Sequence, residues 1–324
     1  MSTTLIPVPQ LARQAKVASR RLAVASSAEK DAALLAAADL LVARAADLLE
    51  ANAADVARAE ADGTSPTLVD RLRLTDARIE NMAGGLRQVA ALRDPVGEIT
   101  DGWVRPNGLR IERVRVPLGV VAIIYESRPT VTSDAAALCL KSGNAAFLRG
   151  SSSAIDSNIA IATVMREALE KVGLPADGVV LVHDTSRAAA TEFMQQRGLV
   201  DCLIPRGGRS LIESILENAT VPYVIDGDGN CHVYVDRAAD LVMAREIVLN
   251  AKMQRPSVCN AAESLVVHAD VADAFLPAVA TALDGVDLVG DGRARALVPR
   301  VEPATEADVA TEFRDLKRSV KVGD

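Results

Sequence analysis

One cysteine, Cys259, stands in a context that suits nucleophilic chemistry. It lies in the polar, proline-interrupted segment Gln-Arg-Pro-Ser-Val-Cys-Asn at residues 254–260, directly after a predicted helix. Two nearby cations, Lys252 and Arg255, would favour the thiolate form of the side chain, which attacks acyl carbon atoms. The spacing alone leaves open whether Cys259 is a nucleophile. The other cysteines sit inside apolar runs and are expected to be small buried hydrophobic residues: Cys139, Cys202 and Cys231.

Two further segments combine arginine with glycine where a predicted strand meets a predicted helix. The first, Arg149-Gly-Ser-Ser-Ser, offers a cation, a permissive glycine and three hydroxyls, which suits a phosphate or a ribose. Serines at this place can also be simple helix caps. The second, Arg206-Gly-Gly-Arg-Ser, lets the backbone approach an anion, although a tight turn with solvated arginines explains it equally well. The second segment lacks the Gly-x-Gly-x-x-Gly fingerprint of dinucleotide-binding loops.

Other motifs that would indicate a different chemistry are absent from the sequence. The three histidines, His183, His232 and His268, lie in or at the ends of predicted strands without metal-ligand spacing, so we interpret them as structural. No serine occupies a Gly-x-Ser-x-Gly elbow. The segment Asp-Gly-Asp-Gly-Asn at residues 226–230 is too short and out of register for a calcium loop, and we interpret it as a crossing between domains. We therefore predict no metal site.

The elements expected to position these residues begin with helices. Residues 11–61 are rich in Ala, Leu, Arg, Lys and Glu without Gly or Pro, which predicts at least two helices, and a further helix is predicted over residues 75–91. Asn-Gly at residues 107–108 predicts the turn of a hairpin between strands over 102–105 and 109–116. This hairpin either projects to pair with another subunit or forms a plain surface ribbon.

From residue 120 onward apolar strands alternate with helical stretches, as in parallel β-α-β units of a doubly wound sheet. A second α/β domain is predicted to start near Tyr223. The strands of the first sheet are predicted over residues 120–125, 145–149, 179–183 and 199–204, and its helices over 131–141, 154–172 and 187–197. In the second domain, strands are predicted over 223–226, 231–235 and 263–268, and helices over 240–253 and 270–283.

Length and composition narrow the class of protein. A chain of 324 residues predicts two domains at roughly 150 residues each. The net charge of -7 and the supply of only four Phe, three Tyr and one Trp argue against a nucleic-acid-binding surface. Four scattered cysteines, no basic leader followed by an apolar run and no uninterrupted apolar span predict a cytoplasmic protein without a membrane segment.

Three segments of the sequence together resemble one family. They are Pro-Leu-Gly-Val-Val-Ala-Ile-Ile-Tyr-Glu-Ser-Arg-Pro at residues 117–129, Leu-Lys-Ser-Gly-Asn-Ala-Ala-Phe-Leu-Arg-Gly at 140–150, and Asn-Ala-Lys-Met-Gln-Arg-Pro-Ser-Val-Cys-Asn at 250–260. In this order they closely resemble the gamma-glutamyl phosphate reductases, also called glutamate-5-semialdehyde dehydrogenases, of the aldehyde dehydrogenase superfamily. The resemblance runs over essentially the whole chain, and the first and last segments are specific to this branch.

This resemblance implies an aldehyde dehydrogenase-like α/β fold, with an NADP-binding domain over residues 1–225, an oligomerisation hairpin over 103–117 inserted in it, and a catalytic domain over 226–324. It implies NADPH-dependent reduction of L-glutamate 5-phosphate to L-glutamate 5-semialdehyde and phosphate, the second step of proline biosynthesis. Cys259 falls at the family's nucleophile and would form a thioester, with the Asn260 N–H helping to stabilise the oxyanion. A homo-oligomer, and association with the glutamate 5-kinase of the same pathway, are expected for the family.

The resemblance also suggests residues for the two ligands. Arg149 stands where related dehydrogenases often place a lysine beside the adenosine ribose, and with Ser151 and Ser152 it is expected to receive the 2′-phosphate of NADP. The remaining cofactor candidates are Gly150, Arg206, Gly207 and Gly208. A substrate with a phosphate and a carboxylate needs cations and hydrogen-bond donors, and which arginine meets which group stays open. The substrate candidates are Ser127, Arg128 and Arg255.

Two departures from related proteins shape the expectation. Hydrolytic aldehyde dehydrogenases carry a glutamate base near the point that matches residues 226–230, whereas this chain has no glutamate there, so activation of water is not expected. Family members also continue past the point that matches residues 319–322, so a chain ending at Asp324 is expected to leave the hairpin and several strands of the second domain without neighbours. Two functions stay open: the Cys259 enzyme, or a catalytically incomplete nucleotide-binding remnant of it.

Overall fold

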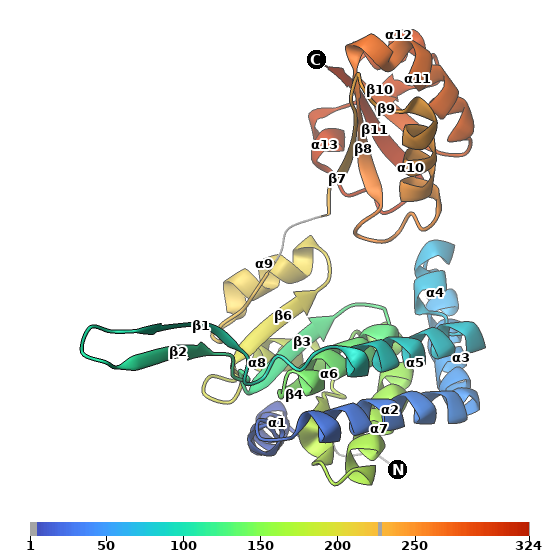
Figure 1. Ribbon diagram of the computed structural model, residues 1–324. Coiled ribbons are helices and arrows are strands. Elements are labelled where there is room, and N and C mark those ends of the chain that lie inside the picture. The colour runs from blue at the N-terminus through green and yellow to red at the C-terminus, as the bar shows by residue number, and fades with distance from the viewer. Residues whose placement is uncertain (1–4, 226–228, 324) are drawn as a thin grey trace. The chain divides into compact units, whose positions relative to one another are not determined.

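The computed structural model describes residues 5–225 and 229–323. The chain divides into two compact units, Met1–Ile225 and Asp226–Asp324 (Figure 1). Each unit has its own hydrophobic core and its own parallel sheet. Both units are therefore α/β in architecture, as the alternation of apolar strands and helices predicted.

The first unit begins with helices that follow local capping chemistry. The Ser26 side chain accepts a hydrogen bond from the Glu29 N–H while the Glu29 carboxylate accepts one from the Ser26 N–H, and this capping box starts the second helix. Leu34 and Leu41, seven residues apart on that helix, are fully buried. The helices are α1 (Val8–Leu22), α2 (Ser27–Ala43), α3 (Ala45–Ala61), α4 (Pro66–Leu72) and α5 (Asp76–Ala91).

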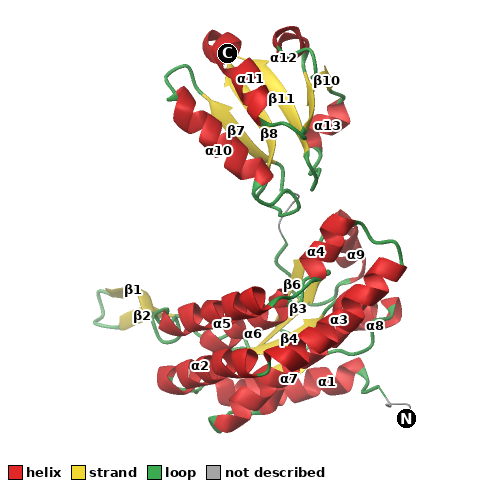
Figure 2. Ribbon diagram, turned by 90° about the vertical axis from the view of Figure 1, so that its right-hand side faces the viewer, coloured by secondary structure: helices red, strands yellow, loops and turns green. Residues whose placement is uncertain are grey.

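The predicted hairpin is present and projects from the first unit (Figures 1 and 2). Its antiparallel strands are β1 (Ile99–Val104) and β2 (Arg110–Val114). The turn between them closes with a hydrogen bond from the Gly108 N–H to the Arg105 carbonyl, and Gly108 has a φ of 86°, which glycine adopts without steric cost. Apolar side chains on the hairpin, including Trp103 and Val104, are exposed.

The first sheet is parallel and has the strand order β5-β4-β3-β6 among the described residues. The chain runs outward from β3 to β5 and then returns to the other side of β3, so its direction of winding reverses between β3 and β6. Ligands of open α/β sheets bind outside the carboxyl ends of the strands at such a reversal. The strands are β3 (Val120–Tyr125), β4 (Ala145–Arg149), β5 (Val179–Leu181) and β6 (Cys202–Arg206).

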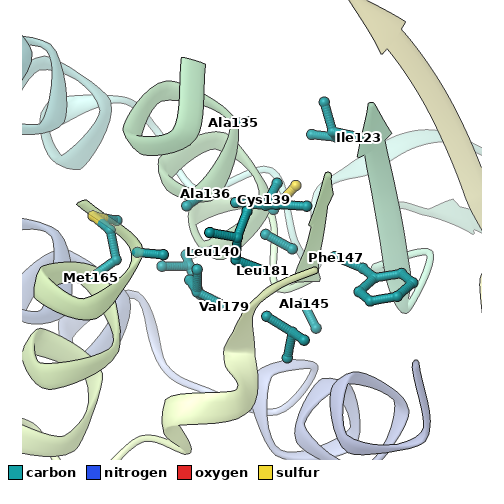
Figure 3. Close-up of a cluster of buried hydrophobic side chains, with 14 of the residues drawn as sticks. Ile123, Ala135, Ala136, Cys139, Leu140, Ala145, Phe147, Met165, Val179 and Leu181 are labelled. Carbon is teal, nitrogen blue, oxygen red and sulfur yellow. The ribbon is translucent and has the colours of Figure 1, made fainter. Parts of the chain in front are cut away.

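Helices cover this sheet on both sides (Figure 2). The α6 and α7 helices pack against each other and the sheet, with α2, α3 and α5 outside them, and α1 packs against α8. Small residues allow this close packing: Ala135, Ala136 and Cys139 of α6 face the apolar strands (Figure 3). The connecting helices are α6 (Thr130–Lys141), η1 (Ser152–Ala154), α7 (Ile155–Lys171), η2 (Ala176–Gly178), α8 (Arg187–Phe193) and α9 (Arg209–Asn218).

The second unit is built around another parallel sheet, in the order β10-β9-β11-β8-β7 over its described residues. Its core is formed mainly by valines and leucines, such as Val248, Leu265 and Val320. The strands are β7 (Cys231–Val235), β8 (Ala262–His268), β9 (Asp287–Gly290), β10 (Glu302–Pro303) and β11 (Lys317–Gly323). The helices are α10 (Leu241–Met253), α11 (Ala269–Ala282), α12 (Gly292–Leu297) and α13 (Glu306–Ala310).

The strands predicted over residues 223–226 and 199–204 differ from the structure. The strand predicted over residues 223–226 is wrong as far as the described residues show it, because Tyr223 forms only an isolated bridge to Leu203, and Asp226 lies outside them. The strand predicted over 199–204 begins instead at Cys202, because residues 199 and 200 still hydrogen-bond to the carbonyl of Gln196 in a turn. In the sheet of the second unit β11 inserts between β8 and β9, whereas β10 and β7 at its two ends each have a described neighbour on one side only.

Candidate active site

The candidate residues of the first unit gather where the winding of its sheet reverses. Backbone register places Arg149 beside Ile124 on one side of β3 and Arg206 beside Tyr125 on the other. The two arginine-glycine segments therefore flank the loop that follows β3, which begins at Glu126. Parallel strands bring all three loops to one edge of the sheet.

Serine hydroxyls connect two of these loops. The Ser153 hydroxyl lies 2.8 Å from the Ser127 hydroxyl and 2.7 Å from the Ser151 hydroxyl. Among the described residues, Ser151 makes no side-chain capping bond at the start of η1. Helix capping therefore does not explain the Ser151 hydroxyl, whose hydrogen-bond partner is the hydroxyl of Ser153. Ser153 was not singled out as a site residue, although its place in a run of three serines was the available signal.

Gly150 is required by space. A Cβ atom added there would lie 2.2 Å from the Nδ2 atom of buried Asn158. The Asn158 Oδ1 accepts a hydrogen bond from the Thr132 hydroxyl at 3.0 Å, and that hydroxyl lies 2.7 Å from the Tyr125 hydroxyl. Within the described part of the chain, Asn158 Nδ2 has no hydrogen-bond partner. Asn158 thus packs closely against Gly150, a contact that sequence reasoning missed.

Arg149 is half-buried at the end of β4. Its Nη2 atom donates to the backbone carbonyls of Thr185 at 2.8 Å and Ser186 at 3.2 Å, which ties β4 to the loop after β5. Its Nε atom is buried and has no hydrogen-bond partner among the residues described. Burial lowers the pKa of Arg149, and the nearby Asp184 carboxylate opposes that shift. The result is a fixed cation with an unused donor at the sheet edge.

The loop after β6 is tied to the loop after β3 by Glu126. The Glu126 Oε1 accepts a hydrogen bond from the Gly208 N–H at 3.2 Å, and the Glu126 N–H donates to the Arg206 carbonyl at 3.2 Å. A Cβ atom on Gly207 would lie 2.7 Å from Leu211 and 2.9 Å from the Glu126 carboxyl carbon. A larger residue at position 207 would have to displace the side chains of Leu211 and Glu126. The Glu126 carboxylate already takes one of the N–H groups that this loop was expected to offer to an anion.

The candidate nucleophile belongs to the second unit. Cys259 is exposed in the turn that follows α10 and precedes β8, and Arg255 and Asn260 of the same turn are exposed as well. Its backbone carbonyl accepts a hydrogen bond from the Cys231 thiol at 3.5 Å. A Cβ atom on Gly229 would lie 2.2 Å from that same carbonyl oxygen. The start of β7 therefore packs closely against the Cys259 backbone, and only glycine fits at position 229.

Two expectations about this region are wrong. Lys252 was expected to favour the Cys259 thiolate, but its side chain is fully buried and its Nζ lies 2.6 Å from Glu263 Oε2. A lysine on the buried face of a helix keeps its charge only beside a partner, so its field is neutralised locally. Cys231 was expected to be buried, but it is half-exposed at the edge of the sheet, whereas Cys139 and Cys202 are buried.

Two of the three histidines, His232 and His268, make structural hydrogen bonds. His268 accepts a hydrogen bond from the Asp270 N–H and so caps α11, and His232 Nδ1 lies 2.7 Å from the Asn230 carbonyl. Across residues 5–225 and 229–323, no group of three or more His, Cys, Asp or Glu side chains is placed to hold a metal ion. The acidic residues Asp226 and Asp228 of the proposed crossing segment lie outside the described residues. The described helices include none that is both long enough and apolar enough to cross a membrane.

Comparison with known proteins agrees with this fold. The aldehyde dehydrogenase family model matches residues 6–315 of the chain. The chain therefore belongs to the aldehyde dehydrogenase family. Within that family it belongs with the gamma-glutamyl phosphate reductases, which are oxidoreductases, and this confirms the resemblance seen in its sequence segments.

The similarity to these relatives is extensive. The gamma-glutamyl phosphate reductase of Lacticaseibacillus casei is 53% identical over 326 residues, which cover 100% of this chain and 78% of the relative. That of Caldanaerobacter subterraneus subsp. tengcongensis is 49% identical over 313 residues, covering 96% of this chain and 76% of the relative. The crystal structure of the Thermotoga maritima protein of the same name matches with a TM-score of 0.90 at 45% identity, covering 98% of this chain and 77% of that one.

Proposed function

We propose that the chain reduces L-glutamate 5-phosphate to L-glutamate 5-semialdehyde with NADPH and releases phosphate, the second step of proline biosynthesis. The observation that carries this proposal is the exposed Cys259 in the turn between α10 and β8, in a chain that belongs with the gamma-glutamyl phosphate reductases. An exposed thiol on a backbone packed against neighbouring strand residues is suited to nucleophilic attack.

Cys259 acts as the nucleophile in this proposal. Its thiolate attacks the acyl carbon of the substrate, the bond from that carbon to the phosphate oxygen breaks, and phosphate leaves with the bonding electrons, so that a thioester forms. The Asn260 N–H stabilises the negative oxygen during attack. NADPH, when bound, supplies the hydride that reduces the thioester carbon. Cleavage of the carbon–sulfur bond then releases the aldehyde and regenerates the Cys259 thiolate.

The sheet edge of the first unit fits an NADP cofactor. Arg149 carries a fixed positive charge and a buried Nε without a partner in the described residues, which suits the 2′-phosphate and favours NADP over NAD. Gly150 and Gly207 carry no side chain that would keep the backbone of these loops away from a ligand. The residues proposed to hold the cofactor are Arg149, Gly150, Ser151, Ser152, Arg206, Gly207 and Gly208.

The substrate carries two anionic groups that require cations. Arg128, in the loop after β3, and Arg255, in the Cys259 turn, supply guanidinium groups that bind carboxylate and phosphate oxygens well. Ser127, which is linked to Ser153 by hydroxyl groups 2.8 Å apart, supplies a further hydrogen-bonding group. We propose these residues as the substrate-binding set.

The absence of a glutamate at residues 226–230 supports a reaction that ends in phosphate exchange and not in hydrolysis. A general base there would activate water and convert the thioester to glutamate. We further propose that the enzyme works in the cytoplasm, that copies of it associate through the β1–β2 hairpin, and that it associates with the glutamate 5-kinase that makes its substrate.

The test is reduction of NADP by the purified chain in the presence of glutamate 5-semialdehyde, with and without phosphate. Phosphate-dependent turnover is expected, and Cys259→Ser should abolish it while leaving NADPH binding intact. Cys202→Ala, which alters a buried cysteine of β6, is the matched control and should keep its activity. Normal turnover by the Cys259→Ser variant would refute the nucleophile, and NADPH binding without any turnover by the wild type would favour the catalytically incomplete remnant.

A further inference from the structure

A buried ion pair closes the base of the turn that carries Cys259. Lys252 is in the last turn of α10 and Glu263 is the second residue of β8, eleven positions later. Their charged atoms are 2.6 Å apart, and both side chains are fully buried. The chain between them leaves the helix at Met253 and enters the strand at Ala262, so Cys259 stands on a loop whose two ends are joined by this pair.

A second interaction ties the same two elements. Arg318 of β11, also fully buried, donates from Nη1 to the Val248 carbonyl of α10 at 3.0 Å and from Nη2 to the Ser264 carbonyl of β8 at 3.4 Å. Burial lowers the pKa of Arg318 to about 10, and the Glu263 carboxylate opposes this shift. The base of the Cys259 loop is thus held by a carboxylate with cations on α10 and β11.

The second carboxylate oxygen of Glu263 also has a hydrogen-bond partner. Glu263 Oε1 accepts a hydrogen bond at 3.3 Å from the N–H of Arg314, a residue that is held at a φ of 55°. A carboxylate with both oxygens engaged has a single orientation, which fixes the ammonium of Lys252 in turn. The pair therefore defines the geometry of the loop base in a way that an apolar contact would not.

Stability alone is a weak reason for such a pair. Removing two charges from water is costly, and apolar residues of similar size often stabilise a core at least as well. We propose that Lys252 and Glu263 are positioning residues, which hold the ends of the loop over residues 253–262 so that Cys259 meets the substrate in one orientation. The inference rests on the proposed function, because it assigns the pair a role in presenting the nucleophile proposed there.

The test compares Lys252→Met, Glu263→Gln and the double variant Lys252→Met/Glu263→Gln. Each single change removes one charge of the pair and should lower Tm, most of all Glu263→Gln, which leaves the buried cations Lys252 and Arg318 without their carboxylate. The double variant should melt at a higher temperature than Glu263→Gln, because only Arg318 is then left without that carboxylate. With both charges gone, kcat should fall about tenfold or more while KM stays within about threefold, because orientation of the nucleophile is lost and not substrate binding. Alkylation of Cys259 by iodoacetamide, which needs no such orientation, should stay within about twofold of the wild-type rate.

Hydrogen exchange gives a readout that does not require turnover. Amides of residues 254–261 should exchange faster in the double variant, and those of α11 should not change. The matched control is Lys30→Met/Asp94→Asn, which removes the ion pair of buried Lys30 with Asp94 from the first unit. It should leave both kcat and the exchange of residues 254–261 at wild-type levels. Two results would overturn the inference. One is that the loop of the double variant exchanges at the wild-type rate. The other is that the double variant keeps the wild-type kcat while Cys259→Ser is inactive. Loss of the proposed function itself would show instead as an inactive wild type or an active Cys259→Ser variant.

Discussion

Arg149 joins a structural role to a proposed role in cofactor choice. Its Nη2 holds the carbonyls of Thr185 and Ser186, while Nε faces no partner in the described structure. Replacing Arg149 by Ala should weaken binding of NADPH more than that of NADH, because a charge-assisted contact to the 2′-phosphate contributes about 1.5 to 3 kcal/mol. Titration of each cofactor by fluorescence measures the two dissociation constants.

The comparison between the cofactors separates the two roles. Loss of the carbonyl contacts alone would loosen the loop and weaken both cofactors equally, and an equal loss would therefore count against a contact with the 2′-phosphate. Arg149→Lys is the control, since it keeps the charge at the sheet edge but loses the planar fork that reaches both carbonyls. It should retain most of the preference for NADPH.

At the scale of single residues, the sequence predicted which residues lie in turns and loops better than it predicted the direction of their side chains. The proline-broken turn around Cys259 was predicted because its polar residues interrupt a helical pattern. The direction of the Lys252 side chain was not predicted, although Val248, one turn earlier, lies on the same buried face of α10. The reason is that the partner of Lys252, Glu263, belongs to a different element. Asn158 and Glu126 were missed for the same reason, because each has its hydrogen-bond partner on another element: Asn158 of α7 meets Thr132 of α6, and Glu126 meets Gly208.

The capping box of α2 gives this helix a pH dependence of its own. Glu29 accepts hydrogen bonds from the Ser26 backbone and side chain and pairs with Arg21, and these contacts lower the pKa of Glu29 from 4.5 to about 2. A lowered pKa means that the ionised form stabilises the folded state, fully above pH 4.5 and not at all once the pH falls below about 2. Glu29→Gln should therefore lower Tm at pH 6, and the difference from wild type should vanish near pH 2.

Thermal melts of both proteins between pH 6 and pH 2 measure this dependence. Glu170→Gln, at an exposed position on α7, is the matched control and should show no comparable change in its Tm difference. A difference between wild type and Glu29→Gln that stays constant down to pH 2 would contradict the assignment of the stabilisation to the ionised carboxylate.

Whole elements were predictable where apolar runs were short and bounded by clear turn residues. The bounds of β3, β4 and β7 agree with the sequence pattern to the residue. The first two are mostly buried apolar runs, and β7 is a short run rich in β-formers after Gly229 and Asn230. The pattern failed where tertiary pairing decides. Tyr223 and Val224 resemble a strand in composition, but among the described residues their backbone pairs only with Leu203, and their side chains remain largely exposed.

At the scale of the whole molecule, the first unit contains its own core. Its buried apolar cluster is drawn from residues between Val8 and Val221, and the sheet inside it is paired without strands of the second unit. A chain of residues 1–225 should therefore fold alone and unfold in one cooperative transition, because it is long enough to bury a core of ordinary size. Circular dichroism on heating measures the transition, and titration with NADPH measures retained cofactor binding.

The outcome that would contradict this prediction involves the core of the second unit. Its smaller core includes Val248 of α10 and Val320 of β11, both outside residues 1–225. If the core of the first unit depended on them, the isolated chain would melt gradually and bind a dye specific for exposed apolar surface, which would contradict the prediction. A cooperative melt without NADPH binding would confirm independent folding but show that the sheet edge alone does not suffice for the cofactor.

The exposed hairpin carries a fluorescence signal that does not depend on catalysis. Trp103 is the single tryptophan of the sequence, and it lies on β1 with 41% of its surface exposed. Indole emission therefore arises from one place, the projecting hairpin, and its wavelength shortens when that place is shielded from water. The wavelength of maximum emission, measured over a series of protein concentrations, therefore reports assembly through the hairpin. This measurement needs no label, no substrate and no working nucleophile.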